Sequence, residues 1–243
     1  MVVVHIKSIY RKILAGVMLF TAQAILVALL FIGSIVAFLA IARYVFLNEK
    51  HDFDAAAFSF LHNYVSEGTT QIMLFFSVLG NYQALVTANV LLTLYFLFIR
   101  KHKWYSIKIA SIALSSVIIM SLMKIWFNRS RPLLPLLEPA RGLSFPSGHA
   151  MSSVTFFGLI IYYIYRNVKN RALKTALISV LLLIILMIGF SRVYLRVHYA
   201  SDVLAGYSAG IIWLMLSIWI LRKIEFYSKR EINPVVESKV SMM

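Results

Sequence analysis

Residues 181–214 read LLLIILMIGFSRVYLRVHYASDVLAGYSAGIIWL, two apolar runs joined by a short polar turn. The turn carries the pattern Ser191-Arg192-x5-His198-x3-Asp202. Charged groups near lipid are costly unless they are paired or hydrated, so membrane proteins keep them where they have a function. The stretch therefore predicts two membrane-spanning helices whose connection holds part of a functional site.

Apolar runs of similar length recur along the whole chain. Of its 243 residues, 61% are hydrophobic and only 14% are charged, a smaller charged share than a soluble domain carries. A helix needs about 20 apolar residues to cross a bilayer. Six runs approach or exceed that length: 13–42, 72–99, 105–127, 149–165, 175–191 and 199–221. We predict an all-α fold, a polytopic six-helix transmembrane bundle, with a single domain over residues 1–230 and a polar cytoplasmic tail over 231–243.

The basic residues predict the orientation of this bundle. The net charge of +15 would suit a nucleic-acid partner if the basic residues formed one patch, but they lie in short loops between apolar runs. One face of the six-span arrangement holds 16 of the 24 basic residues and 3 of the 9 acidic residues, and positive loops stay in the cytoplasm. We therefore expect no nucleic-acid partner, and an integral protein of the bacterial inner membrane with both termini cytoplasmic. The absence of cysteine excludes disulfides and thiolate metal sites.

Two further motifs flank the third and fourth apolar runs. Lys124-x6-Arg131-Pro132 closes the third run, and Pro146-Ser147-Gly148-His149 opens the fourth. With six spans, both motifs and the turn at 191–202 lie on the extracytoplasmic side. The motif core 124–202 is thus expected to form one active site at that interface.

His198 and Asp202 are four residues apart at the start of a helix, so their side chains share one face. A carboxylate that accepts from one ring nitrogen fixes the tautomer and frees the other nitrogen as a nucleophile or base. A buried ion pair that only packs is the alternative. Arg192 lies across the turn and has the planar fork that binds phosphate in a bidentate manner.

The second motif predicts a helix N-terminus with Ser147 at the capping position. The unpaired N–H groups and the positive dipole at such a terminus suit an anion. A capping turn explains Ser147 and Gly148 equally well, but it does not explain a titratable His149 at the membrane boundary.

The surroundings of each remaining cation on this side indicate whether it binds a ligand or only anchors the protein in the membrane. Lys124 lies inside an apolar run, which favours a paired functional role, and Arg131 follows at the end of that run. We interpret Arg129 and Arg141 as anchors that reach the interface, and Arg196 as a headgroup contact.

Two segments outside the motifs bear on the architecture. Residues 52–66 place apolar side chains at helical spacing, which predicts a short amphipathic helix in the interface. Its expected role is packing or a lid rather than substrate contact. Polar and glycine residues at 77–83 interrupt the second run, so the crossing helix there can begin as late as Tyr82.

In this order and spacing, the three motifs resemble those of the type 2 phosphatidic acid phosphatase superfamily, which includes bacterial lipid phosphatases, glucose-6-phosphatase and vanadium haloperoxidases. All eleven specified positions match. The resemblance implies that Lys124, Arg131 and Arg192 bind the phosphate oxygens. Ser147 and the Gly148 amide would complete this phosphate site.

The resemblance also implies the catalytic roles. His198 would attack phosphorus and form a phosphohistidine, and Asp202 would orient it. His149 would protonate the leaving oxygen and then help to activate the hydrolytic water. Cations and N–H donors suit the spread charge of a transferring phosphoryl group.

The expected function is a metal-independent membrane lipid phosphatase without a cofactor, which hydrolyses a phosphomonoester or diphosphate headgroup. Undecaprenyl diphosphate is the first substrate considered, and phosphatidylglycerophosphate, phosphatidic acid and lipid A phosphate are alternatives. A lipid phosphotransferase would use the same phosphohistidine with another acceptor. A transporter fits less well, because its charged groups usually lie at the bilayer midplane. The sequence leaves the oligomeric state open.

Overall fold

The computed structural model describes residues 2–49, 51–137 and 140–232, and helices dominate these ranges. The longer helices, in chain order, are α1 (Val2–Ala42), α2 (Asp52–His62), α3 (Glu67–Leu79), α4 (Tyr82–Leu94), α5 (Lys103–Phe127), α6 (Gly148–Asn167), α7 (Arg171–Tyr194) and α8 (Ala200–Tyr227). Short π-helical turns extend three of them: η1 (Arg43–Leu47), η2 (Tyr95–Ile99) and η3 (Ser228–Ile232). Most of the tail predicted over 231–243 lies outside the described residues.

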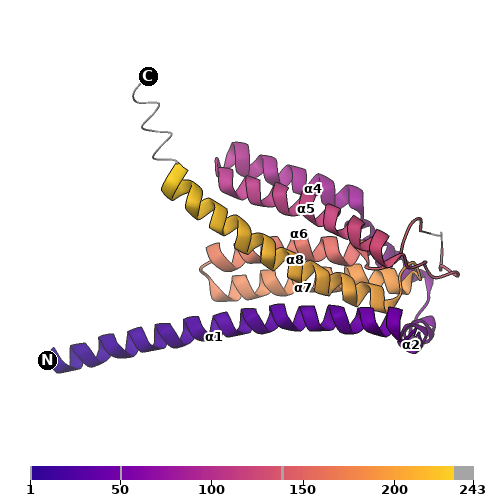
Figure 1. The fold of residues 1–243 in the computed structure, drawn as a ribbon, viewed down its shortest axis with the longest axis horizontal. Helices are drawn as coiled ribbons and strands as arrows, with labels where there is room; N and C mark the ends of the chain where they lie inside the picture. The colour runs from indigo at the N-terminus through magenta and orange to yellow at the C-terminus, as the bar shows by residue number, and fades with distance from the viewer. Residues whose placement is uncertain (1, 50, 138–139, 233–243) are drawn as a thin grey trace, which may run out of the picture.

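The helices form an elongated bundle around α6 (Figure 1). α6 packs against α5, α7 and α8, and α1 runs along α8 on the outer side. The start of α1 and the end of α8 lie at one end of the bundle, whereas α2 and the connections before α6 and α8 lie at the other end (Figure 1). A chain that crosses the membrane an even number of times is expected to begin and end on the same side, as these two helix ends do.

Five segments of the described chain are long and apolar enough to cross a membrane: Thr21–Leu47, Tyr82–Ile99, Lys103–Phe127, Arg171–Tyr194 and Ala200–Arg230. α6 is the sixth predicted span and is less apolar. Its 20 residues reach about 30 Å at 1.5 Å per residue, and its polar Ser153 and Thr155 are buried within the bundle. A helix that faces other helices does not need an apolar surface all round, so the predicted all-α membrane bundle is confirmed.

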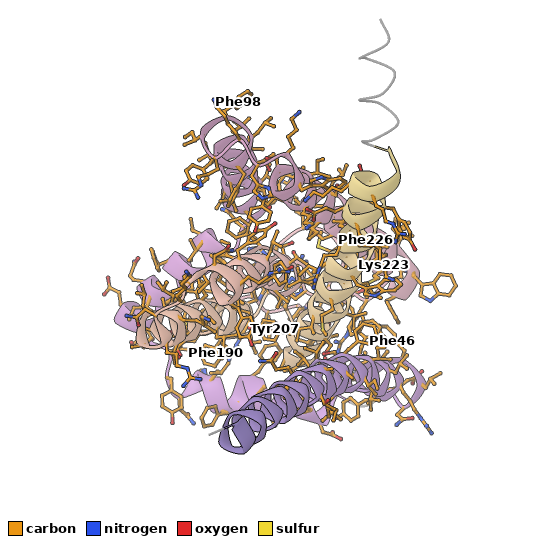
Figure 2. All side chains as sticks on the ribbon, turned by 90° about the vertical axis from the view of Figure 1, so that its left-hand side faces the viewer. Phe46, Phe98, Phe190, Tyr207, Lys223 and Phe226 are labelled. Atoms are coloured by element: carbon orange, nitrogen blue, oxygen red, sulfur yellow. The ribbon has the colours of Figure 1, made fainter. Side chains whose placement is uncertain are left out.

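The outer surface of the bundle is apolar, as lipid contact requires. Phe98, Phe190 and Phe226 are 68%, 42% and 56% exposed and are among the side chains that project outward in Figure 2. Burial of a charged group is the exception that needs an explanation in such a protein.

The second predicted span is two helices rather than one. α3 ends at Leu79, and the Asn81 side chain caps α4 by accepting from the Ala84 N–H at 2.7 Å. Gly80 between them lies so close to α7 that an added Cβ would be 2.2 Å from Ile188 Cγ2. The segment 72–99 is therefore not one continuous span. The crossing helix begins at Tyr82, which confirms the later start that the interruption at 77–83 indicated.

Glycines on α8 bring it against the start of α6. A Cβ on Gly206 would lie 2.6 Å from the Ser147 carbonyl oxygen, and one on Gly210 would lie 2.8 Å from Val154 Cβ. The Ser147 N–H also donates to the Asp202 carbonyl at 2.9 Å. These close approaches place the second and third motifs side by side.

Candidate active site

The three motifs meet at one end of the bundle, next to α2 (Figure 1). Arg131 lies within electrostatic range of Lys124, Arg192 and His198. His149 lies within the same range of Arg131, Arg192 and His198. The structure thus gathers three cations and two histidines from α5, the following loop, α6, α7 and the turn before α8.

His198 is held between a carboxylate and a guanidinium. Its Nδ1 lies 3.4 Å from Asp202 Oδ2, and Arg131 donates from Nη1 to its Nε2 at 3.1 Å. Because a guanidinium only donates, Nε2 is the acceptor and Nδ1 carries the proton. The lone pair of Nε2 therefore faces the cations, as a nucleophile for an anionic substrate requires.

Burial keeps the His198 ring neutral. Only 1% of the residue is exposed, and burial lowers its pKa to about 4, against the raising effect of the hydrogen bond with Asp202. Arg131 lowers the pKa further by charge repulsion. At neutral pH the ring is unprotonated at Nε2 and is available to attack.

Asp202 is fully buried and saturated with donors. Arg129 donates to its Oδ1 at 2.6 Å, while the Tyr199 N–H donates to Oδ2 at 2.9 Å and the Ser144 hydroxyl donates to the same oxygen. Ser144 Oγ also lies 3.3 Å from His198 Nδ1. The carboxylate is therefore fixed in the orientation that meets the imidazole.

Arg129 is not the interfacial anchor expected from the sequence. It is 8% exposed and donates from its other terminal nitrogen to Asp54 Oδ2 at 2.8 Å. Asp54 also accepts from the backbone N–H of Ser201 at 2.9 Å and from its hydroxyl at 2.7 Å. The guanidinium lies 4.0 Å from the Tyr199 ring centroid. These contacts tie α2 to the start of α8 beside His198.

Two predicted phosphate ligands keep a polar atom free. Ser147 Oγ and Arg192 Nε are buried and have no hydrogen-bond partner among the described residues. Ser147 precedes α6, but its side chain makes no capping hydrogen bond. Arg192 donates from Nη1 to the Ser77 hydroxyl of α3. Because buried polar atoms are nearly always paired, these two unpaired atoms indicate a polar ligand in this site.

Backbone carbonyls hold the other two cations. Lys124 Nζ donates to the Leu143 carbonyl at 2.6 Å, and Arg131 donates from Nε to the Gly142 carbonyl at 2.9 Å and from Nη1 to the Val197 carbonyl at 2.7 Å. Burial lowers the pKa of Arg131, and Asp202 opposes this effect. Neither cation is neutralised by a carboxylate within ion-pair distance in the described ranges, so their charge is available to an anion.

His149 and the Gly148 amide occupy the first turn of α6. His149 lies beside the break between α3 and α4, where a Cβ on Gly80 would be 3.3 Å from its Cδ2. A Cβ on Gly148 would lie 2.7 Å from Met120 Sδ and 3.9 Å from Lys124 Cε. The first N–H groups of this helix therefore lie close to the Lys124 side chain, next to the cations.

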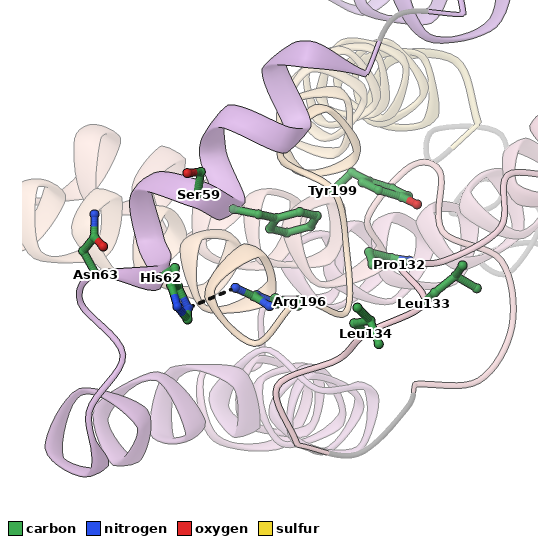
Figure 3. Close-up of a pocket in the computed structure, with 9 residues that line it drawn as sticks. Ser59, His62, Asn63, Pro132, Leu133, Leu134, Arg196 and Tyr199 are labelled. Atoms are coloured by element: carbon green, nitrogen blue, oxygen red, sulfur yellow. Dashed lines mark hydrogen bonds between the residues drawn. The ribbon is translucent and has the colours of Figure 1, made fainter.

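A pocket of about 600 Å³ opens beside this cluster (Figure 3). Its walls are the C-terminal part of α2, residues 132–134 directly after Arg131, and the turn that contains Arg196 and Tyr199. A mostly apolar cavity of about 430 Å³ lies between α4, α5 and α6 and includes Ser152, one turn after His149.

The described residues contain no group of three or more histidine, aspartate or glutamate side chains that could hold one metal ion. Metal-independent activity stays a prediction.

Several residues of the site were missed or underrated from the sequence. Asp54, Ser77 and Ser144 belong to no motif, and their contacts join residues 58 to 147 positions apart. Only Asp54 left a signal, as an acidic residue in the segment that was predicted to form an amphipathic helix. Arg196, interpreted as a headgroup contact, lines the pocket.

Comparison with known proteins identifies a family and relatives that match the part of the chain containing the three motifs. The family model described as PAP2 superfamily matches residues 104–226. Phosphatidylglycerophosphatase B of Bacillus subtilis (strain 168) is 33% identical over 95 residues, which is 39% of this chain and 47% of that protein. Lipid phosphate phosphatase delta of Arabidopsis thaliana is 27% identical over 77 residues, 31% of this chain and 18% of that protein. The chain thus spans less than half the length of these curated relatives.

Two crystal structures share the fold. One, described as the first transmembrane PAP2 type phosphatidylglycerolphosphate phosphatase from Bacillus subtilis, matches with a TM-score of 0.73 at 24% identity over 81% of this chain and 98% of that chain. The other, Aquifex aeolicus LpxE, matches with a TM-score of 0.54 at 22% identity over 67% of this chain and 92% of that chain.

Proposed function

The chain belongs to the PAP2 superfamily, and we propose that it is a membrane lipid phosphatase that removes the terminal phosphate of phosphatidylglycerol phosphate. The observation that carries the proposal is the pair of unpaired buried atoms, Ser147 Oγ and Arg192 Nε, in the cluster that contains His198. A phosphate has oxygens enough to satisfy both atoms and to accept from the neighbouring cations.

In the first step, Nε2 of His198 attacks phosphorus. The phosphorus–oxygen bond to the lipid breaks, a phosphohistidine forms, and His149 donates a proton to the leaving lipid oxygen. Lys124, Arg131 and Arg192 stabilise the negative charge on the three other oxygens of the transferring group. Asp202 keeps the proton on Nδ1 and stabilises the positive charge that develops on the ring.

In the second step, water attacks the phosphohistidine. His149, now neutral, takes a proton from this water, and the bond between Nε2 and phosphorus breaks. Inorganic phosphate leaves, and His198 returns to its starting tautomer. The cations fulfil the charge-stabilising role that magnesium has in other phosphatases, so we expect activity without a divalent metal.

Phosphatidylglycerol phosphate is favoured by the sequence relative, whose name is Phosphatidylglycerophosphatase B. Undecaprenyl diphosphate, the first substrate considered from the sequence, is supported by no comparison and becomes the second candidate. Phosphatidic acid and lipid A phosphate share the phosphomonoester and complete the panel to be tested.

The apolar cavity between α4, α5 and α6 supports a lipid substrate. It has a volume of about 430 Å³ and reaches α6 residues one to two turns from His149. An acyl chain in this cavity would leave the headgroup at the cations. The excess of basic residues at the opposite end of the bundle supports a site on the extracytoplasmic side, with both termini in the cytoplasm.

The test is phosphate release by the purified protein from these four lipid phosphates, with a chelator present. We expect hydrolysis of phosphatidylglycerol phosphate with the highest kcat/KM, and none by His198→Ala. A strict magnesium requirement would contradict the metal-free mechanism. Transfer of the phosphate to an added alcohol without release to water would indicate a phosphotransferase instead.

A further inference from the structure

The pocket beside the reactive histidine contains a cation that the reaction does not use. Arg196 projects into it from the turn between α7 and α8, and its Nη2 lies 3.4 Å from Nδ1 of His62 at the end of α2 (Figure 3). In the part of the chain that the structure describes, no carboxylate lies within ion-pair distance of Arg196. Its positive charge is therefore available to a ligand.

The backbone at Arg196 adopts a left-handed conformation. Its φ is +54°, in the left-handed region where a residue with a side chain is disfavoured and where glycine or asparagine is usual. The hydrogen bonds from the Arg196 N–H to the Val193 carbonyl (2.9 Å) and from the His198 N–H to the Arg192 carbonyl (3.2 Å) hold this conformation. Strain that is held by surrounding structure is concentrated at functional sites.

Two residues of the pocket wall directly follow residues of the phosphate cluster in the chain. Pro132 in its wall follows Arg131, and Tyr199 in its wall follows His198. The opposite wall is fixed, because Asp54 of α2 accepts from Ser201 and Arg129, and because the rings of Phe58 and Tyr199 pack with centroids 5.9 Å apart. The pocket is therefore preformed beside residues that adjoin Arg131 and His198 in the chain.

We propose that this pocket is a subsite for a second phosphate of the substrate, bound by Arg196 and His62. This inference rests on the proposed function and makes its substrate class more specific. The ligand is a phosphodiester separated from the transferred phosphate by a short polyol, as in phosphatidylglycerol phosphate. Ser59 and Asn63, which also line the pocket, provide hydrogen-bonding groups for the polyol hydroxyl.

Other lipid phosphates would not use Arg196. In phosphatidic acid the transferred phosphate is attached directly to the diacylglycerol, so no second anion exists. In an isoprenyl diphosphate the second phosphate is bonded to the first and would lie among the cations around His198. The pocket therefore distinguishes a phosphodiester one glycerol away from both other headgroups.

The experiment compares Arg196→Gln with the wild type on three substrates: phosphatidylglycerol phosphate, phosphatidic acid and an isoprenyl diphosphate. Arg141→Gln is the matched control, since Arg141 is an exposed arginine of the same side of the bundle that does not line the pocket. Loss of a charge-assisted hydrogen bond weakens binding by about tenfold to a hundredfold. We expect this increase in KM for phosphatidylglycerol phosphate only, with kcat unchanged. Arg196→Lys should restore part of the affinity.

The outcomes separate the subsite from the proposed function. Unchanged KM for phosphatidylglycerol phosphate in Arg196→Gln, or an equal loss on all three substrates, would overturn the subsite while the phosphatase assignment stands. A wild-type protein that hydrolyses phosphatidic acid but not phosphatidylglycerol phosphate would overturn the proposed substrate and the subsite together. Retained activity on phosphatidic acid shows that the variant is folded.

Discussion

Arg129 Nη1 lies 2.6 Å from Asp202 Oδ1, and both side chains are buried. This pair connects the residue that orients His198 to the interfacial helix, because Arg129 also binds Asp54 at 2.8 Å. One guanidinium thus compensates two buried carboxylates. The geometry of His198 therefore depends on α2, a helix that carries none of the three motifs.

Replacement of Arg129 by glutamine is expected to impair both stability and catalysis. Removing one partner of a buried ion pair costs about 3–5 kcal/mol, and a small displacement of a catalytic group lowers kcat by about a hundredfold. Replacing Arg129 leaves the Asp54 carboxylate without its guanidinium partner. A double variant that also carries Asp54→Asn lacks this unpaired charge and should unfold at a higher temperature than Arg129→Gln alone. Thermal unfolding in detergent micelles and kcat measure the two effects. Equal unfolding temperatures for Arg129→Gln and the exposed control Arg141→Gln would contradict the role of the pair.

The hydroxyl of Ser147 is expected to matter for activity and not for stability. Because its Oγ has no partner in the described protein, Ser147→Ala breaks no hydrogen bond of the fold. With the phosphate bound, one charge-assisted hydrogen bond is lost, which corresponds to about tenfold to a hundredfold in kcat/KM.

Ser144→Ala is the comparison for this prediction, since the Ser144 hydroxyl donates to Asp202. It should lower the unfolding temperature as well as the activity. A Ser147→Ala protein with full activity would argue against Ser147 as a phosphate ligand.

If His198 is the nucleophile, as we propose, the pH dependence of kcat/KM is expected to report its protonation. Burial lowers its pKa to about 4, so the ring stays neutral as the pH falls from 7 to 5, where an ordinary histidine with a pKa of about 6.5 would be protonated. The substrate phosphate has its own ionisation at about pH 6. Only the substrate phosphate then gains a proton between pH 6 and pH 5. Log kcat/KM should therefore fall in this interval with a slope of no more than one. A slope of two in this interval would mean that His198 titrates with the substrate and would refute the neutral nucleophile.

Filling the apolar cavity between α4, α5 and α6 should weaken binding of long-chain substrates. Ala113 lines this cavity, and Ala113→Trp would displace several methylene groups of an acyl chain, each worth about 0.8 kcal/mol. KM for a long-chain lipid phosphate should rise about tenfold or more, and KM for a water-soluble phosphomonoester should stay constant. Ile118→Trp on the same helix is the control, because Ile118 is 51% exposed and lies outside the cavity lining. The same increase for both substrates would show that the cavity does not hold the chain.

Much of the fold follows from apolar run length, because a bilayer imposes it directly. Apart from the second run, each predicted run coincides with a long helix, and even α6, with its buried serines, follows from its length and its neighbours. The break at Gly80 was only half visible. Its polar neighbours signalled an interruption, but the close approach to Ile188 on α7, more than 100 positions away in sequence, could not be predicted.

In the site, too, some residues could be predicted from the sequence and others could not. Lys124, Arg131 and His198 were predictable because their residue types are out of place in apolar surroundings. Arg129 was wrongly interpreted as an anchor, since an arginine that reaches the interface and an arginine buried between two aspartates look alike in sequence. Its partner Asp54 is 75 residues away, and only the packing of α2 on α8 brings the two together.

The proposed mechanism requires that Nε2 of His198 carries the phosphoryl group during turnover. This can be tested by rapid quenching of the wild-type protein with phosphatidylglycerol phosphate labelled in its terminal phosphate. We expect an alkali-stable, acid-labile label on the peptide that contains His198, formed before phosphate is released and absent from His198→Ala. A label on any other residue, or wild-type turnover by His198→Ala, would contradict the proposed mechanism.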